Sequence, residues 1–257
     1  MKNTLYKIPA STLFLGKNLV FVPECHSTNT LALQLCQNSG PVEGTLVITP
    51  NQTAGRGQRG NGWEAEPGKN FTFSLILKPT TLAVKDQFYL NIFTSLALHD
   101  YVTAKACTAV RVKWPNDIYV GSKKVCGILV ESQISGNKFS HVVVGIGLNV
   151  NQQKFGTDTA TSLSVLTGLQ FDLQTELETL LKFLEARYLQ LREGKMTLLM
   201  EDYLNVLYGL NTPLSFDVDG MPVEGMIAGV DESGRLRVLM EGKERVFGVK
   251  EVGYKVV

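Results

Sequence analysis

Apolar residues in the first 150 positions fall into short runs and helical repeats, which together predict a layered fold of strands and helices. Runs of strand length occupy residues 19–23, 45–52 and 70–79. Apolar residues at helical spacing mark residues 27–37 and 86–104. The first of these helices has Ser27 or Thr28 as its predicted N-cap, because short hydroxyl side chains favour that position.

Residues 110–151 consist almost entirely of strand-forming sequence. Turn signals at Gly121-Ser122 and Gly136-Asn137 divide this stretch into hairpins. Hairpins pair antiparallel strands, so the pattern predicts an α+β fold with a mostly antiparallel or mixed central sheet. It argues against a doubly wound parallel sheet.

The last third of the chain changes to helices and then to short strands. Leucine and tyrosine spacing predicts helices over residues 172–194 and 196–207. After residue 210, the turn signals DVDGMP, DESGR and MEGKE separate short β segments. We therefore expect two domains, a larger one of residues 1–210 and a small β-barrel domain of residues 211–257.

The charge balance and the cysteine pattern exclude several classes of protein. Lysine and arginine number 25 against 24 acidic residues, so the chain has no overall basic character for nucleic acid. No apolar run approaches the roughly 18 residues of a membrane span. The four cysteines are scattered and form no C-x-x-C pair, which argues against a zinc site or a disulfide framework. We expect a cytoplasmic protein with no permanently bound cofactor.

The segment AGRGQRGNGW, residues 54–63, is the first candidate site. Glycine permits close approach of the backbone to a ligand, and arginine offers planar donors for phosphate or carboxylate. The segment lacks the G-K-[ST] ending of a P-loop, and a strand follows it instead of the helix of a dinucleotide fingerprint. Two interpretations of the segment remain, an anion site and a plain structural loop. The two arginines and Trp63 favour the anion site.

Three further stretches, KWPNDI, KKVCGIL and GIGLNVN, place polar residues and glycines in strand sequence. Asn116 and Asp117 offer oxygens for Mg²⁺, although a strand with a proline bulge explains them as well. Lys123 is expected in solvent, whereas Lys124 is expected to serve function. Gly145 and Gly147 lie two residues apart on one strand face and could leave a groove for a flat ligand, or allow close packing under a helix.

These four motifs, in this order, resemble those of the biotin protein ligase family, and the resemblance covers nearly the whole chain. GRGQRGNGW, KWPNDI, KVCGILVE and GIGLNV correspond to the family patterns G-R-G-R-x-G-R-x-W, K-W-P-N-D, K-x-x-G-I-L-x-E and G-I-G-x-N-V. The resemblance implies a catalytic domain related to class II aminoacyl-tRNA synthetases, followed by an SH3-like barrel. Relatives that act as repressors carry a winged helix in front. Only 26 residues precede Ser27, so we expect a ligase without DNA-binding function.

The resemblance also implies the chemistry, in which ATP activates biotin as biotinyl-5'-AMP and a lysine of a biotin carboxyl carrier domain then receives the biotinyl group. The implied catalytic residues are Lys124, Arg56 and Asp117. The implied biotin-binding residues are Ser27, Thr28, Asn29, Gln52, Gly55, Arg56, Gly57, Lys124, Gly127, Gly145 and Gly147. The implied ATP-binding residues are Arg56, Gln58, Arg59, Trp63, Lys113, Asn116 and Asn149. Asn116 and Asp117 are expected to hold Mg²⁺, and a homodimer is expected.

The chain departs from the family pattern at two positions. Gln58 and Asn61 stand where arginines are usual, so we expect the adenylate to be held less tightly unless Arg59 compensates. Two alternative functions stay open, a lipoate protein ligase that forms an acyl-adenylate in the same way and a biotin-binding module without catalysis. The second alternative is disfavoured because the chain retains the charged residues of the motifs, Arg56, Lys113, Asp117 and Lys124.

Overall fold

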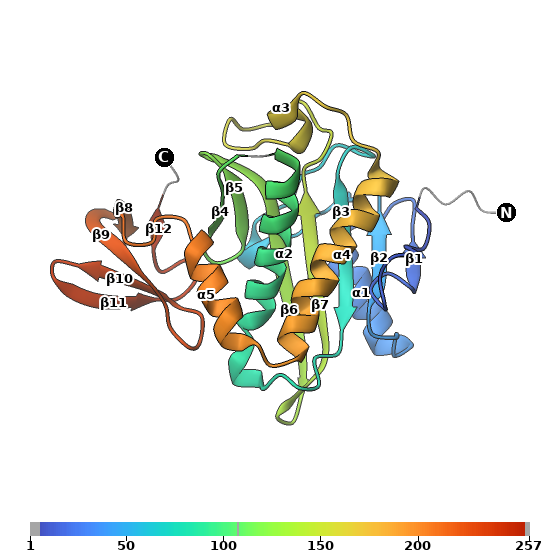
Figure 1. Cartoon of the computed structure of the whole chain (residues 1–257), viewed down its shortest axis with the longest axis horizontal. Helices are drawn as coiled ribbons and strands as arrows, with labels where there is room; N and C mark the ends of the chain where they lie inside the picture. The colour runs from blue at the N-terminus through green and yellow to red at the C-terminus, as the bar shows by residue number, and fades with distance from the viewer. Residues whose placement is uncertain (1–5, 107, 255–257) are drawn as a thin grey trace.

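The larger of two β-sheets runs through the middle of the molecule (Figure 1). The computed structural model describes residues 6–106 and 108–254, and of Arg59 it describes only the backbone. The large sheet has the strand order β1-β2-β3-β7-β6-β5-β4. Its strands are β1 (Leu19–Phe21), β2 (Thr45–Thr49), β3 (Phe71–Leu77), β4 (Val110–Lys113), β5 (Asp117–Val120), β6 (Lys123–Ser135) and β7 (Lys138–Leu148). β1 and β2 pair in parallel and all other neighbours pair antiparallel, so the predicted α+β fold with a mixed sheet is confirmed.

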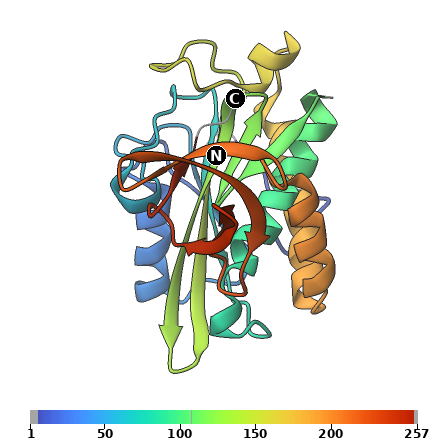
Figure 2. The ribbon, with the colours of Figure 1, turned by 90° about the vertical axis from the view of Figure 1, so that its left-hand side faces the viewer.

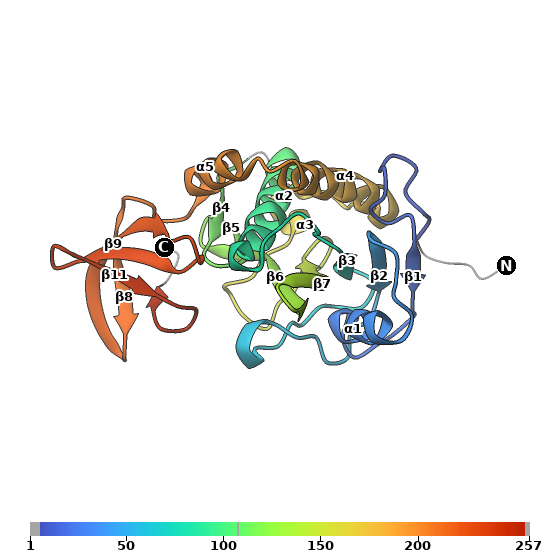
Figure 3. The same cartoon turned by 90° about the horizontal axis from the view of Figure 1, so that it is seen from below.

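Helices cover both faces of this sheet (Figure 3). One face carries α1 (Thr28–Asn38), for which Ser27 is the N-cap residue. The other face carries α2 (Tyr89–Ala106), α4 (Leu173–Arg192) and α5 (Met196–Val206). The sequence pattern did not predict the short helix α3 (Leu163–Thr167) or the 3-10 turns Gln58–Gly60 and Val84–Asp86, because elements of three to five residues are too short to show a repeat.

Strand β3 lies near the centre of the sheet and is buried along its whole length. All seven of its side chains are buried, since helices cover both faces. Two of them are hydroxyls, at Thr72 and Ser74, and these need hydrogen-bond partners inside the protein. Thr72 donates to the carbonyl of Thr49 at 2.7 Å, and Ser74 donates into the functional site described below.

The C-terminal segment forms a five-stranded antiparallel sheet of order β11-β10-β9-β8-β12, which is strongly curved (Figure 2). Its strands are β8 (Pro213–Val218), β9 (Met221–Val230), β10 (Leu236–Met240), β11 (Lys243–Phe247) and β12 (Gly253–Tyr254). Two hydrogen bonds tie this part to β4 and the turn after it. The Tyr208 N–H donates to the carbonyl of Val112 at 2.8 Å, and the indole N–H of Trp114 donates to the carbonyl of Gly234 at 2.8 Å.

No helix within residues 6–106 and 108–254 is long and apolar enough to cross a lipid bilayer.

Candidate functional site

A cavity of about 430 Å³ lies against the middle of the large sheet and is closed on one side by the C-terminal sheet. Most of the residues expected at a site line it together, although they come from distant parts of the chain. They are Ser27, Thr28, Asn29, Gln52, Arg56, Gly57, Gln58, Trp63, Lys113, Asn116, Asp117, Lys124, Gly127, Gly145 and Gly147.

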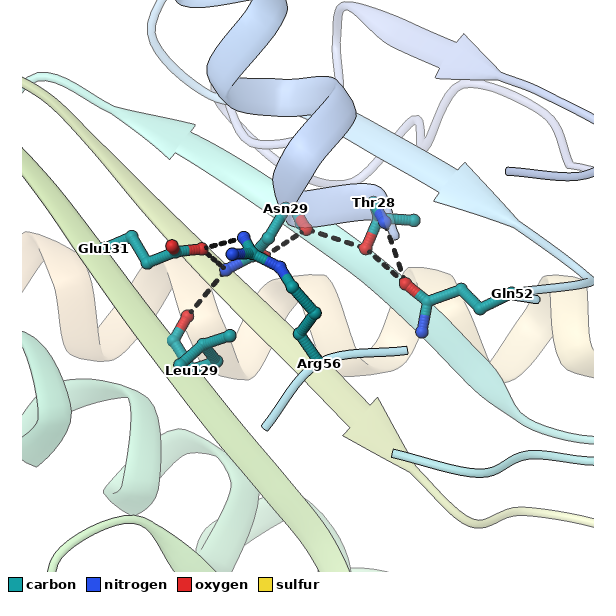
Figure 4. Close-up of polar contacts among 7 residues, drawn as sticks. Thr28, Asn29, Gln52, Arg56, Leu129 and Glu131 are labelled. Carbon is teal, nitrogen blue, oxygen red and sulfur yellow. Dashed lines mark hydrogen bonds and ion pairs between the residues drawn. The ribbon is translucent and has the colours of Figure 1, made fainter. Parts of the chain in front are cut away.

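One wall of the cavity is a chain of amide and hydroxyl groups (Figure 4). The side-chain oxygen of Gln52 accepts from the Thr28 N–H at 2.8 Å. The Thr28 hydroxyl lies 2.8 Å from that of Ser74, which donates to Asn29 Oδ1 at 2.6 Å. Asn29 Nδ2 then donates to Glu131 Oε2 at 2.8 Å. Neutral donors and acceptors held in this way suit a neutral polar ligand group, because each is already fixed by a neighbour.

Arg56 closes this chain at its acidic end. Its Nη2 lies 2.6 Å from Glu131 Oε2, and the two side chains are 42% and 28% exposed. The sequence analysis did not name Ser74, and it included Glu131 only as the last residue of KVCGILVE, without a role. A signal for Glu131 was present, since it follows Gly127 by four residues along β6 and so lies on the same face. Ser74 pairs in register with Gly145, which gives it the same orientation on β3.

A second wall carries the charges. Lys124 Nζ forms an ion pair with Asp117 Oδ1 at 2.8 Å, and Lys113 stands opposite Asp117 in the β4–β5 register. Burial lowers the pKa of Lys113, and the positive charge of Lys124 lowers it further against the attraction of Asp117. Backbone hydrogen bonds hold Lys124 on both sides, from its N–H to the carbonyl of Thr159 and from the Thr161 N–H to its own carbonyl.

The balance of charge favours an anionic ligand. Four of the lining side chains are cationic and one is acidic. The cations are Arg56, Lys113, Lys124 and Lys250. Convergent ammonium and guanidinium groups in a partly desolvated cleft attract phosphates and carboxylates strongly.

The indole of Trp63 packs against two glycines of the sheet. A Cβ on Gly127 would stand 3.0 Å from the Trp63 ring, and a Cβ on Gly147 would overlap the ring outright. Lys124 Nζ is 5.5 Å from the same ring, within the range of a cation–π contact. A Cβ on Gly145 would overlap the side-chain amide of Asn29. The glycines therefore let Trp63 and Asn29 approach the strands.

Three of the expected site residues are not among the described residues that line the cavity. Gly55 lies within the loop, where a Cβ would collide with the carbonyl of Trp63. Asn149 is buried, and its Nδ2 donates to the carbonyl of Thr161 at 3.0 Å, beside the backbone of Lys124. The side chain of Arg59 lies outside the described part of the chain.

The C-terminal segment contributes residues that the sequence analysis did not foresee. Those that line the cavity are Val249, Lys250, Val252, Gly253 and Tyr254. Their pattern is that of an ordinary short strand, and they lie about 120 positions after the KKVCGIL motif, so no local signal linked them to it.

Asn116 and Asp117 are the residues that could hold a metal ion. Among the residues that the structure describes, no group of three or more His, Cys, Asp or Glu side chains could hold one. Asn116 donates from Nδ2 to the carbonyl of Ile128, which leaves its amide oxygen to act as an acceptor. One amide oxygen and one carboxylate fit Mg²⁺, since this ion usually keeps several waters and takes its other ligands from phosphates.

Comparison with known proteins identifies relatives along most of the chain. Residues 22–149 match the model of the Biotin/lipoate A/B protein ligase family. The chain is 33% identical over 249 residues to the bifunctional ligase/repressor BirA of Bacillus spizizenii, which covers 94% of this chain and 74% of the relative. It is 30% identical over 241 residues to the biotin--[acetyl-CoA-carboxylase] ligase of Mycobacterium tuberculosis, covering 92% of this chain and 88% of that enzyme.

A solved structure agrees with these relatives. A mutant biotin protein ligase from Aquifex aeolicus in complex with biotin superimposes with a TM-score of 0.75 at 25% identity, covering 94% of this chain and 99% of the other. The motifs, the fold and these likenesses lead to one conclusion. The chain belongs to the biotin/lipoate A/B protein ligase family.

Proposed function

We propose that this chain is a biotin–protein ligase, which joins biotin to AMP with ATP and then transfers the biotinyl group to a lysine of a biotin carboxyl carrier domain. Relatives named for this activity cover most of the chain. The observation that carries the proposal is the cavity itself, in which a neutral hydrogen-bonding wall meets a cationic wall. A molecule with a polar uncharged ring at one end and a carboxylate at the other would use both walls.

The amide and hydroxyl wall is proposed to bind the ureido ring of biotin. A ureido group has two N–H donors and one strong acceptor, and Ser27, Thr28, Asn29 and Gln52 offer both kinds of partner. These groups are positioned before ligand arrives by their bonds to each other and to Ser74. Preorganised partners reduce the entropy lost on binding.

The cationic wall is proposed to bring the two acids together in the first step. An oxygen of the biotin carboxylate attacks the α-phosphorus of ATP, the bond from that phosphorus to the bridging oxygen breaks, and pyrophosphate leaves. Lys124 would lie between carboxylate and α-phosphate, with Lys113 and Arg56 on the phosphates. Stabilising the charge that develops on the phosphoryl oxygens is the main catalytic contribution available to such a site.

In the second step the amine of the acceptor lysine attacks the carbonyl carbon of the mixed anhydride. AMP leaves with the electrons of the broken C–O bond, and the extra proton of the amine must be accepted. Asp117 is the acid that lines the cavity, and we propose it for that role beside its ion pair with Lys124. Mg²⁺ held by Asn116 and Asp117 would screen the phosphates of the incoming nucleotide.

Exchange of labelled pyrophosphate into ATP tests the proposal. The expected result is exchange that depends on biotin and not on lipoate, followed by transfer of biotin to a carrier domain. Exchange that depends on lipoate would assign the chain to the other branch of its family. Biotin binding without exchange under any condition would make the protein a binding module and refute the proposal.

Four expectations from the sequence stay predictions. They are a domain boundary near residue 210, an SH3-like topology for the C-terminal sheet, a homodimer and a cytoplasmic location. The C-terminal sheet shares no strand with the large one, which supports the boundary.

A further inference from the structure

The ammonium group of Lys113 lies between two tyrosine rings that belong to different sheets. Lys113 Nζ is 5.0 Å from the ring centroid of Tyr254 and 5.5 Å from that of Tyr119. Tyr119 is in β5 of the large sheet, and Tyr254 is in β12 of the C-terminal sheet. Both distances fall within the range of cation–π attraction. The C-terminal sheet therefore contacts a cation of the cavity directly.

Lys113 has reason to need this support. It is half-buried, so its ammonium group has lost part of its water and needs partners inside the protein. Asp117 faces it in register, but the same carboxylate is ion-paired with Lys124 at 2.8 Å. One acid thus serves two ammonium groups. The two ring faces add attraction for Lys113 without another acid that would repel phosphate.

The ring of Tyr254 is itself firmly held. Its side chain is buried, with its ring stacked on Tyr208 at 6.4 Å between centroids and 12° between planes. It also packs against Phe216 at 5.5 Å. The N–H of Tyr208 donates to the carbonyl of Val112, the residue before Lys113. Aromatic and backbone contacts therefore fix the ring relative to β4, so its position is set by the joint between the sheets.

We propose that Tyr254 is a positioning residue for the nucleotide half of the site, and that its ring seats Lys113 so that the ammonium meets the phosphates of ATP. This inference rests on the proposed ligase function and deepens it. It gives the C-terminal sheet a part in forming the adenylate. The effect falls on ATP, because Thr28 and Gln52, the expected biotin partners, belong to α1 and to the loop after β2.

Steady-state kinetics of biotin-dependent pyrophosphate exchange test the proposal. Tyr254→Leu should raise the KM for ATP by about threefold to thirtyfold, the range of one partly desolvated cation–π contact. The KM for biotin should stay at its wild-type value. Tyr254→Phe keeps the ring and should restore the KM for ATP. Phe247→Leu removes a buried ring from β11 of the same sheet, a ring that takes no part in the contacts described for Tyr254 and Lys113, and it serves as the packing control.

Two further measurements separate positioning from packing. Adding Tyr254→Leu to a Lys113→Met variant should change the KM for ATP less than twofold, since the group being positioned is gone. Fluorination of the ring in Tyr254→Phe weakens its negative face while nearly keeping its shape, so the KM for ATP should rise with each fluorine. This series also answers the question if Tyr254→Leu fails to fold.

The outcomes distinguish this inference from the function on which it rests. Wild-type protein without biotin-dependent exchange would remove the proposed function. If the wild-type protein is active, two results would overturn the positioning role alone. They are a KM for ATP in Tyr254→Leu equal to that of wild type, and a KM for ATP that does not change with fluorination of the ring. Equal losses in Tyr254→Leu and Phe247→Leu would assign Tyr254 to packing and would likewise overturn it.

Discussion

Replacing Lys124 by methionine should separate its catalytic role from its structural one. Methionine keeps an unbranched stem of similar length and removes only the ammonium group. That group now lies 2.8 Å from Asp117 Oδ1 and 5.5 Å from the Trp63 ring. The proposed reaction brings a carboxylate and a phosphate to the same place, so the loss falls mainly on the transition state.

The expected magnitude follows from the geometry. A unit charge about 4 Å from another contributes about 4 kcal/mol at an effective dielectric constant of about 20. Lys113 and Arg56 stay in place and compensate in part, so we expect a fall of about 10²- to 10³-fold in kcat, at about 1.4 kcal/mol per tenfold. The cost to folding should be far smaller. With side chains 30% and 23% exposed, the ion pair with Asp117 contributes about 1 kcal/mol or less.

The assay is biotin-dependent pyrophosphate exchange together with thermal unfolding of the same preparations. Lys123→Met is the matched control, because Lys123 is the adjacent residue of β6 and is exposed. It should match wild type in both measurements. A Lys124→Met protein that is folded and retains exchange to within about tenfold of wild type would remove Lys124 from the mechanism, since about 1.4 kcal/mol is too little for the role.

The other predictions concern the pocket wall, pH and retention of the intermediate. Gly145→Ala should weaken biotin binding measured by calorimetry, because its Cβ displaces the Asn29 amide, whereas Gly156→Ala, whose Cβ meets nothing closer than 4.0 Å, should leave it unchanged. Equal affinities in the two variants would contradict this. Burial lowers the pKa of Lys113 below its unfolded value of 10.5, so its charge costs stability at neutral pH and the cost fades as pH rises toward 10.5. Lys113→Met should therefore raise the urea midpoint of unfolding at neutral pH, and the increase over wild type should be smaller near pH 10.5. An increase that grows with pH would contradict this prediction. Gln58→Arg should slow release of free adenylate in rapid-quench assays without acceptor, and wild-type protein that accumulates no free adenylate would remove the basis for the idea.

The local elements followed from the sequence because each had a local cause. The hairpins around Gly121 and Gly136 were predicted from turn residues, and both glycines adopt positive φ, 57° and 62°. Helix α1 begins at Thr28 with Ser27 at the N-cap position, as predicted, although the Ser27 side chain makes no capping hydrogen bond. Strand β2 ends at Thr49, next to the predicted end near position 50, because Pro50 follows and lacks the N–H that a ladder needs.

The site was predictable only where a motif marked it. Motif residues such as Asp117 and Lys124 meet at the cavity as expected. Ser74 supports one wall of the cavity through strand register, and Tyr254 reaches the cavity through the joint between the sheets. Neither role is visible in a short window of sequence. The position of Trp63 on Gly127 and Gly147 depends in the same way on how the loop folds back over β6 and β7.

Residues of both sheets line the cavity, among them Gly145 and Gly147 of β7 and Tyr254 of β12. A ligand that contacts residues of both sheets stabilises their native arrangement, since it makes all of its contacts only while both sheets are folded and in place. At a hundredfold excess over its Kd such a molecule adds about 2.7 kcal/mol to the free energy of unfolding. In scanning calorimetry, the two sheets of the ligand-bound protein should then unfold together in one transition that is sharper than without ligand.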